Sequence, residues 1–179
     1  MKKMLHLVLS LTAISAVCAA VLAYVNNTTR DAIAQIQVQQ TLDAARAVMP
    51  GAVEKVDPLG ENGGAFVGRN AAGDVVGYAV RGSDPNGYGG EVALMVGFEA
   101  DKTTLVCYRK LAAAETPGLG MNLTLPDFAD QFKGKNASRE LRVKKDGGEI
   151  EAITSATITS RAVCGAVNAA AKTLAALAP

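Results

Sequence analysis

A long apolar segment near the N-terminus most constrains how this chain can fold. Residues 4–25 are almost entirely apolar, and their clearly polar members are His6, Ser10, Thr12 and Ser15. At 1.5 Å per residue, a helix of about 20 apolar residues matches the roughly 30 Å hydrocarbon core of a bilayer. The sequence therefore predicts one transmembrane helix over residues 4–25.

Two lysines set the expected orientation of this helix. Lys2 and Lys3 lie on its short N-terminal side, and positively charged flanks favour the cytoplasm. We therefore expect a single-pass protein of the inner (plasma) membrane, with residues 1–3 in the cytoplasm, a helical connector over 26–49 and an extracytoplasmic domain over 50–179. The rival interpretation is a cleaved signal peptide, although the apolar run exceeds the usual signal core of about 7–15 residues.

The remainder of the chain alternates between strand-like and helix-like patterns. About 150 residues follow the apolar segment, enough for one domain with its own core. The expected elements are helices at 28–48, 125–132 and 161–177, hairpins at 65–80 and 91–109, and a strand at 141–143. This order predicts an α+β fold in which helices pack on a twisted antiparallel or mixed sheet. Asn26 and Asn27 mark either a break between two helices or a point that one long helix crosses.

The composition excludes several functional classes. Lysine and arginine number 18 against 17 aspartate and glutamate, and aromatic residues make up 4% of the chain, so nothing indicates nucleic-acid binding. The single histidine, His6, lies in the apolar segment, which leaves the following domain without one for a Ser-His-Asp triad or a zinc site. Cys107 and Cys164 are too far apart for a CxxC site, and both a disulfide and two free thiols fit the sequence. No glycine-rich loop of the Rossmann or P-loop form is present.

A dense group of hydroxyl residues precedes the C-terminal helix. Residues 151–160 read Glu-Ala-Ile-Thr-Ser-Ala-Thr-Ile-Thr-Ser. A helix start exposes unpaired backbone N–H groups and the positive end of the macrodipole, so it favours a phosphate group placed beside it. Ala156 carries a single methyl group, which lets a bulky ligand approach the backbone. The alternative is a strand that runs into an ordinary Ser or Thr cap.

This stretch resembles the flavinylation motif of membrane redox complexes. That motif has an acidic residue, two spacers, Ser or Thr, a small residue, Ala and a final Thr or Ser before a helix. Residues 151–157 follow the same order, with Glu151 in place of the commoner Asp and Ser155 in place of the commoner Gly. In that family the final hydroxyl is esterified to the phosphate of FMN. The resemblance therefore implies that Thr157 is an FMN phosphoryl threonine.

Two further segments carry the resemblance, in the order that the family has them. Residues 115–120 (Glu-Thr-Pro-Gly-Leu-Gly) and residues 87–90 (Gly-Tyr-Gly-Gly) are similar to segments of the G subunit of the Rnf electron-transport complex and of the related C subunit of sodium-pumping NADH:quinone reductase. Pro117 fixes one dihedral, whereas Gly118 and Gly120 permit positive ones, so the loop can fold tightly against a flat ring. The chain thus resembles the Rnf G subunit over most of its C-terminal domain.

The resemblance implies a site, a maturation step and partners. It assigns FMN binding to Thr157 as the attachment point, Thr154 and Ser155 beside the phosphate, Ala156 as the small residue, and Glu115, Thr116, Gly118 and Leu119 around the ring. Thr159 and Ser160 are expected instead to cap the helix, as Ser and Thr commonly do. A flavin transferase with Mg²⁺ and FAD would load FMN and release AMP. The protein would then be an electron carrier, with no catalytic residue of its own, among other membrane and soluble Rnf subunits that couple ferredoxin–NAD electron flow to Na⁺ or H⁺ movement.

Three alternatives stay open beside the Rnf interpretation. The chain could be the C subunit of the quinone reductase, although that subunit has a longer chain. It could also be a stand-alone flavoprotein that delivers electrons to an extracytoplasmic reductase. In a non-redox anchored binding module, the Ser/Thr segment would be structural and the protein would be colourless.

Overall fold

The computed structural model describes residues 2–51, 53–60 and 63–177. The chain divides into two compact units after Gln40. The first helix, α1 (Lys2–Val48), contributes to both units and runs through Asn26 and Asn27 without a break. Of the two possibilities at these asparagines, the structure shows the single long helix.

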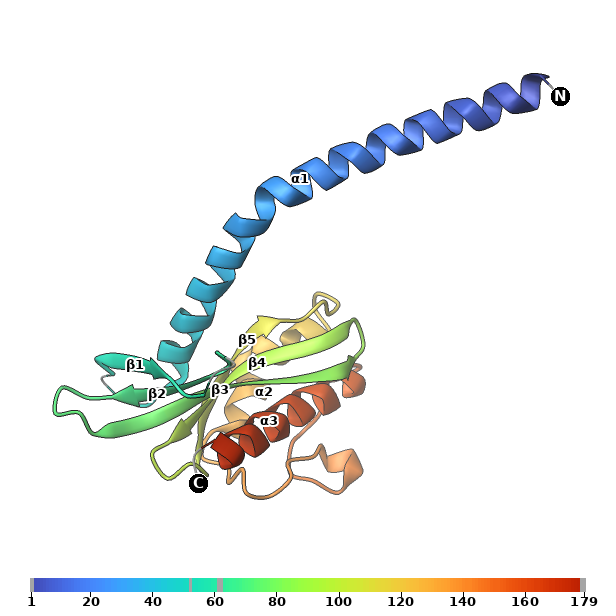
Figure 1. The fold of residues 1–179 in the computed structure, drawn as a ribbon. Helices are drawn as coiled ribbons and strands as arrows, with labels where there is room; N and C mark the ends of the chain where they lie inside the picture. Colours follow the sequence, from blue (N-terminus) through green and yellow to red (C-terminus); the bar gives the residue numbers. More distant parts are fainter. Residues whose placement is uncertain (1, 52, 61–62, 178–179) are drawn as a thin grey trace. The chain divides into compact units, whose positions relative to one another are not determined.

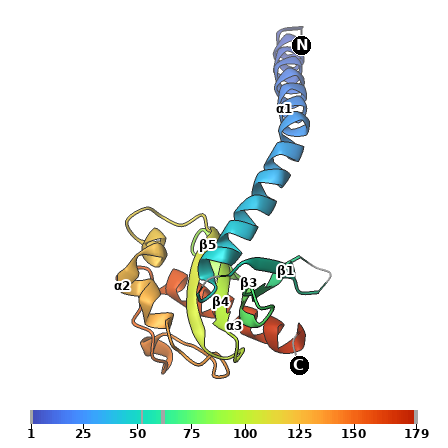
Figure 2. The same cartoon turned by 90° about the vertical axis from the view of Figure 1, so that its left-hand side faces the viewer.

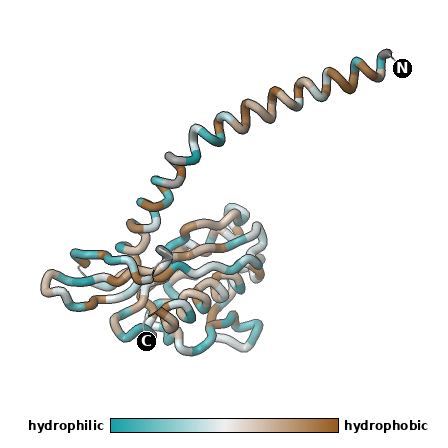
Figure 3. Tube along the Cα trace, viewed as in Figure 1, coloured by the Kyte–Doolittle hydropathy of each residue, from teal (hydrophilic) through white to brown (hydrophobic). Residues whose placement is uncertain are grey.

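The N-terminal part of α1 has the composition of a bilayer-spanning segment. Within the described residues, Lys3–Arg30 is the one stretch long and apolar enough to cross a membrane. Figure 3 shows apolar residues along the length of this stretch. Its large apolar side chains are exposed, among them Leu5, Leu11 and Leu22. Length and composition agree with a membrane anchor, and equally with a signal sequence.

The second unit is built on a five-stranded antiparallel sheet whose spatial order follows the chain (Figure 1). Its strands are β1 (Lys55–Pro58), β2 (Ala65–Arg69), β3 (Val75–Gly87), β4 (Gly90–Glu99) and β5 (Leu105–Ala112). A tight polar turn connects β2 to β3. In the β2–β3 turn, the backbone N–H of Asp74 donates to the side chain of Asn70 at 2.9 Å, an arrangement that Asn favours in turns.

Helices cover the two faces of the sheet. The C-terminal helix α3 (Thr157–Leu177) packs along β3 and β4 on one face, as Figures 1 and 2 show. Alternate residues of β4, such as Leu94 and Val96, join its buried face. The intervening Met95 points to the other face, where it meets Ala45 and Val48 from the end of α1. This alternation is the period-two pattern of a strand buried on both sides.

Short helices close one end of the domain. They are the 3₁₀ helices η1 (Gly120–Thr124), η2 (Asp130–Phe132) and η3 (Lys144–Asp146) and the single-turn α2 (Pro126–Ala129). Tyr108 on β5 packs edge-on against Phe132, which in turn meets Phe128. The α+β fold with an antiparallel sheet packed by helices confirms the sequence prediction.

Three local expectations were wrong. Residues 141–143 form no strand, because only Val143 makes an isolated bridge, to Ile150. The short edge strand β1 was missed, since its four residues lack a clear alternation. The last helix begins at Thr157 rather than at residue 161.

All three cysteines lie among the described residues and are free thiols. Cys164 is buried in the core between α3 and the sheet, whereas Cys107 packs with the cluster on the opposite face. The sheet therefore separates the two thiols. Burial raises the pKa of Cys164 to about 12, which keeps this thiol protonated and unreactive at neutral pH.

Candidate functional site

The hydroxyl-rich segment forms the entry to helix α3. Thr157 is the first helical residue and is half-buried, while Ala156 before it is buried. The first N–H groups of any helix lack intrahelical acceptors, so they are available to an anion placed beside Thr157.

The five hydroxyls of this segment divide into two sets. Thr159 and Ser160 are fully buried and serve the protein's own packing. The Ser160 hydroxyl accepts from the backbone N–H of Ile153 at 2.9 Å and donates to the carbonyl of Ala156 at 2.9 Å. Ser160 therefore fixes the path of the chain into the helix. Thr154 and Ser155 remain exposed, beside the half-buried Thr157.

Ser155 adopts a backbone conformation that side chains rarely take. Its φ is +60°, in the left-handed region that glycine enters without steric cost. This explains physically why glycine is the commoner residue at this place in the motif. The conformation turns the chain sharply just before α3 begins.

We expect Ser155→Gly to be tolerated and Ser155→Val to destabilise the protein by about 1–3 kcal/mol, because a β-branched residue is strained at positive φ. The midpoint of urea unfolding would measure both effects. Thr154→Val is the matched control, since Thr154 is also exposed but is not among the positive-φ residues. Equal midpoints for the two valine variants would contradict the strain argument.

A buried carboxylate joins three segments of the site. Glu115 is 7% exposed. Its Oε2 accepts from the Thr159 hydroxyl at 2.8 Å and its Oε1 from the backbone N–H of Gly89 at 3.3 Å. Glycines make room for it, because a Cβ at Gly120 would lie 2.4 Å from Oε2 and one at Gly87 would lie 2.8 Å from Oε1. The three segments that the sequence analysis singled out therefore meet at one side chain.

Replacing Thr159 with valine should cost about 1–3 kcal/mol of folding free energy, because the change leaves a buried carboxylate oxygen without its hydroxyl donor. Thermal and urea unfolding would measure the loss. Thr173→Val is the matched control on the same helix, where an exposed hydroxyl donates only to the carbonyl of Ala169. We expect the control to stay within about 0.5 kcal/mol of wild type, and a similar result for Thr159→Val would show that the Glu115 contact is unimportant.

A cavity of about 520 Å³ opens beside this carboxylate, within the usual range of about 300–1,000 Å³ for cofactor sites. Its walls come from the glycine loop, the 115–120 loop and the start of α3. The lining residues are Tyr88, Glu115, Thr116, Leu119, Gly120, Ser155, Ala156, Thr157, Ile158 and Thr159. Tyr88, Leu119 and Ile158 expose large apolar surface although the domain buries most such side chains.

The cavity gathers most of the site residues expected from sequence. Glu115, Thr116, Leu119, Ala156 and Thr157 line it, as does Ser155. Thr154 and Gly118 instead line an adjoining cavity of about 450 Å³, which shares Leu119 and Ser155 with the first. Of the two glycines expected to adopt positive φ, only Gly118 does so, at +74°; Gly120 provides space.

Comparison with known proteins identifies the family. The FMN-binding domain family matches residues 87–172. The G subunit of the ion-translocating oxidoreductase complex of Methanosarcina acetivorans is 31% identical over 177 residues, covering 94% of this chain and 93% of the relative. The chain belongs to the G-subunit family of ion-translocating oxidoreductase complexes. The G subunit of the Na(+)-translocating ferredoxin:NAD(+) oxidoreductase complex of Acetobacterium woodii is 36% identical over 191 residues, covering 93% of this chain and 89% of the relative.

This G-subunit chain also resembles solved structures. The C subunit of the Na(+)-translocating NADH-quinone reductase from Parabacteroides distasonis superposes with a TM-score of 0.53 at 26% identity, over 64% of this chain and 62% of that one. The corresponding protein of Shewanella oneidensis gives a TM-score of 0.51 at 20% identity, over 74% of each chain. The FMN-binding domain match begins at Gly87, in the glycine loop, and includes every residue that lines the 520 Å³ cavity.

Sequence reasoning missed several residues of the candidate site. Tyr88 and Ile158 line the cavity and lie inside segments that had been noted, so their apolar character was a usable signal. Lys145 was missed altogether, although its Nζ donates to the Thr157 hydroxyl oxygen at 3.3 Å. It lies 12 residues before Thr157, and the local pattern carries no hint of the contact.

Glu151, the acidic residue of the hydroxyl-rich segment, contacts a lysine. The Glu151 carboxylate forms an ion pair with Lys144. Its backbone N–H donates to the side-chain oxygen of Gln131 at 2.7 Å, and its carbonyl accepts from the Gln131 amide at 3.2 Å. Glu151 therefore fixes the segment that leads to α3.

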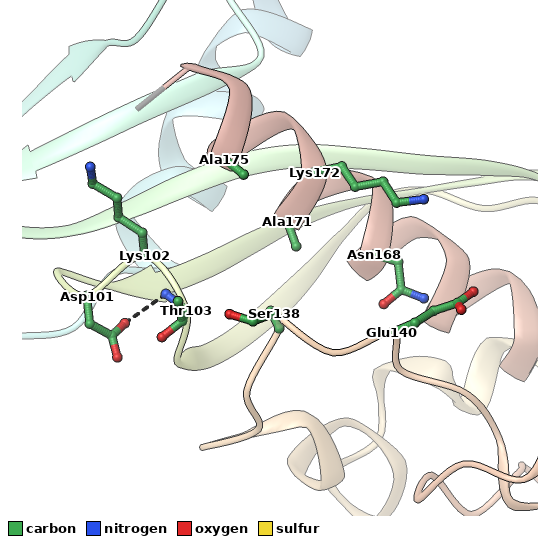
Figure 4. A pocket seen from close by; sticks show the side chains of 10 residues that line it. Asp101, Lys102, Thr103, Ser138, Glu140, Asn168, Ala171, Lys172 and Ala175 are labelled. Carbon is green, nitrogen blue, oxygen red and sulfur yellow. Dashed lines mark hydrogen bonds between the residues drawn. The ribbon is translucent and has the colours of Figure 1, made fainter. Parts of the chain in front are cut away.

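A separate cavity, of about 660 Å³, lies between the C-terminal half of α3 and the β4–β5 turn. Figure 4 shows Ala171 and Asn168 of α3 pointing toward the loop that carries Ser138 and Glu140. Hydrogen bonds from Thr104 and Thr103 lower the pKa of Asp101 to about 2, which marks its carboxylate as a turn-stabilising group. None of the expected FMN-binding residues lines this cavity.

Proposed function

We propose that this protein carries FMN as a phosphoester on Thr157 and works as a membrane-anchored electron carrier. The observation that supports the proposal most strongly is the position of Thr157. Its hydroxyl lies at the start of a 21-residue helix and at the wall of a cofactor-sized cavity. A phosphate on Thr157 would lie beside the helix N-terminus, where backbone N–H groups favour an anion.

The residues around the cavity fit a flavin. Tyr88, Leu119 and Ile158 offer apolar surface for a flat ring. Thr116 supplies a hydroxyl at the edge of the ring, and Ser155 supplies one beside the phosphate. FMN supplies the transfer of one or two electrons. The protein's part is to hold the ring between the two loops and α3. Thr154 and Gly118, on the adjoining cavity, would border the phosphate and the outer side of the 115–120 loop.

Covalent attachment suits a carrier of this kind. A flavin in an open cavity would be lost whenever its affinity fell during the redox cycle, and a phosphoester prevents that loss. A flavin transferase that uses Mg²⁺ and FAD would form the bond. The Oγ1–phosphorus bond forms, the phosphoanhydride bond of FAD breaks, AMP leaves with the electron pair, and the hydroxyl proton passes to a base of the transferase.

We further propose the topology and the partners. Residues 4–25 would span the membrane, with residues 1–3 in the cytoplasm, 26–49 as the connector and 50–179 as the extracytoplasmic FMN-binding domain. The relative from Acetobacterium woodii is named as part of a Na(+)-translocating ferredoxin:NAD(+) oxidoreductase complex. By analogy, the partners here would be the other subunits of an Rnf complex that couples electron flow to Na⁺ or H⁺ movement.

Co-expression with a flavin transferase tests the function. The full chain is purified in detergent, denatured and examined by intact mass and flavin fluorescence, with peptide mapping. We expect the added mass of one FMN phosphoester on the peptide that holds Thr157. An unmodified, colourless protein would overturn the proposal in favour of a non-redox anchored module. Co-purification with Rnf subunits would separate the Rnf assignment from a stand-alone flavoprotein.

A further inference from the structure

The turn η3 presents a lysine to the Thr157 hydroxyl. Lys145 is the central residue of this turn, and its Nζ donates to Thr157 Oγ1 at 3.3 Å. Residues 151–157, which form the motif, contain no lysine or arginine. The contact joins the hydroxyl to a loop that precedes the motif.

Ion pairs hold the two residues beside Lys145. Asp146 accepts from Nε and Nη2 of Arg161, both at 2.7 Å, and this pair lowers the pKa of the Asp146 carboxyl. Lys144 pairs with Glu151. The turn is thus fastened to α3 on one side and to the segment before α3 on the other. Asp146 and Glu151 each have another basic partner, and the Lys145 ammonium donates its hydrogen bond to the Thr157 hydroxyl.

Two glycines fix the backbone of the same turn. Gly147 ends η3 with φ at +80°, and a Cβ at Gly148 would lie 2.0 Å from the carbonyl oxygen of Arg142. Backbone hydrogen bonds from Gly148 to Val143 and from Lys144 to Ile150 close the loop. A side chain at Gly148 would therefore force the turn away from the site.

We propose that Lys145 is a positioning residue for the phosphate that is transferred to Thr157. The inference rests on the proposed function, because it names a residue that serves the same site. Before transfer, the ammonium orients Thr157 Oγ1 through the contact that the structure shows. After transfer, the bond count at phosphorus leaves one negative charge on the phosphodiester. Lys145 offsets this charge through a charge-assisted hydrogen bond.

Lys145→Met tests the proposal in the full chain, with purified flavin transferase, FAD and Mg²⁺. We expect the initial rate of flavin transfer to fall about tenfold, as the loss of a charged hydrogen bond implies, and Lys145→Arg to restore part of the rate. Lys172→Met is the control, because it also removes one lysine charge, but at the 660 Å³ cavity, which none of the expected FMN-binding residues lines (Figure 4). Raising the salt concentration should reduce the difference in transfer rate between wild type and Lys145→Met, since salt screens exposed charges.

A second readout separates positioning from folding. In protein loaded to completion, the ³¹P resonance of the phosphodiester should shift in Lys145→Met and stay unchanged in Lys172→Met. The thermal unfolding midpoints of both variants should equal that of wild type. Equal transfer rates and equal ³¹P shifts for wild type and Lys145→Met would overturn the inference. Failure of wild type itself to accept flavin at Thr157 would instead overturn the proposed function on which it rests.

Discussion

Thr157→Ala is expected to carry no covalently bound flavin after co-expression with a flavin transferase. The change removes the only oxygen of the side chain that can form the phosphoester. It leaves the fold intact, because the Thr157 side chain is half-buried and the buried contacts of this turn come from Thr159 and Ser160. Intact mass and in-gel flavin fluorescence of the denatured protein would measure the loss.

Two controls make the Thr157 result specific. Thr157→Ser keeps a hydroxyl at the helix start and should retain flavin. Thr154→Ala removes a neighbouring exposed hydroxyl that would border the phosphate. Because it leaves the Thr157 hydroxyl in place, any flavin that it carries should still be attached to Thr157. Flavin of unchanged yield on Thr157→Ala, or its loss on Thr154→Ala with Thr157 unmodified, would move the attachment point.

The sequence was sufficient to single out the three segments that line the cavity, because each of the three motifs is local. The hydroxyl segment, the 115–120 loop and the glycine loop each carry a recognisable pattern, and the cavity brings them together. That all three segments meet at the side chain of Glu115 was not predictable in the same way. Glu115 was expected at the ring, and it also accepts hydrogen bonds from Thr159 and Gly89. The partners in these contacts are 44 and 26 residues apart in the sequence, and no periodic sequence pattern predicts contacts over such distances.

The expected caps show where local rules give the wrong detail. Thr159 and Ser160 were expected to cap the last helix because Ser and Thr favour that position. The helix begins earlier, at Thr157, and the hydroxyl of Thr159 is instead committed to Glu115. The tertiary contact outweighs the local preference, since an unpaired carboxylate oxygen at 7% exposure costs more than an unfilled cap. The strand expected at 141–143 failed for a related reason, because the backbone N–H and carbonyl of Leu141 bond the side chain of Asn168 on α3 instead of a neighbouring strand.

Gly82→Ala should destabilise the protein by about 3 kcal/mol or more, because the added methyl group would overpack the interface between the sheet and α3. Gly82 lies on β3, and a Cβ there would meet the Ala166 carbonyl oxygen at 2.0 Å and the Ala170 nitrogen at 2.8 Å. Both atoms are backbone atoms of α3, so no side-chain rotation relieves the clash. The helix has to move away from the sheet, and the interior of a protein tolerates such a shift poorly.

The same displacement reaches the proposed flavin site, because α3 begins at Thr157. Gly82→Ala should therefore lower both the urea midpoint and the yield of flavin on Thr157. Gly64→Ala is the matched control, since a Cβ there makes only ordinary contact, 3.7 Å from the Cβ of Arg81. Unfolding followed by circular dichroism in detergent would compare the two. A Gly82→Ala protein as stable as Gly64→Ala would show that α3 does not pack on β3 as closely as the structure places it. The position of Thr157 beside the cavity depends on that packing and would then be in question.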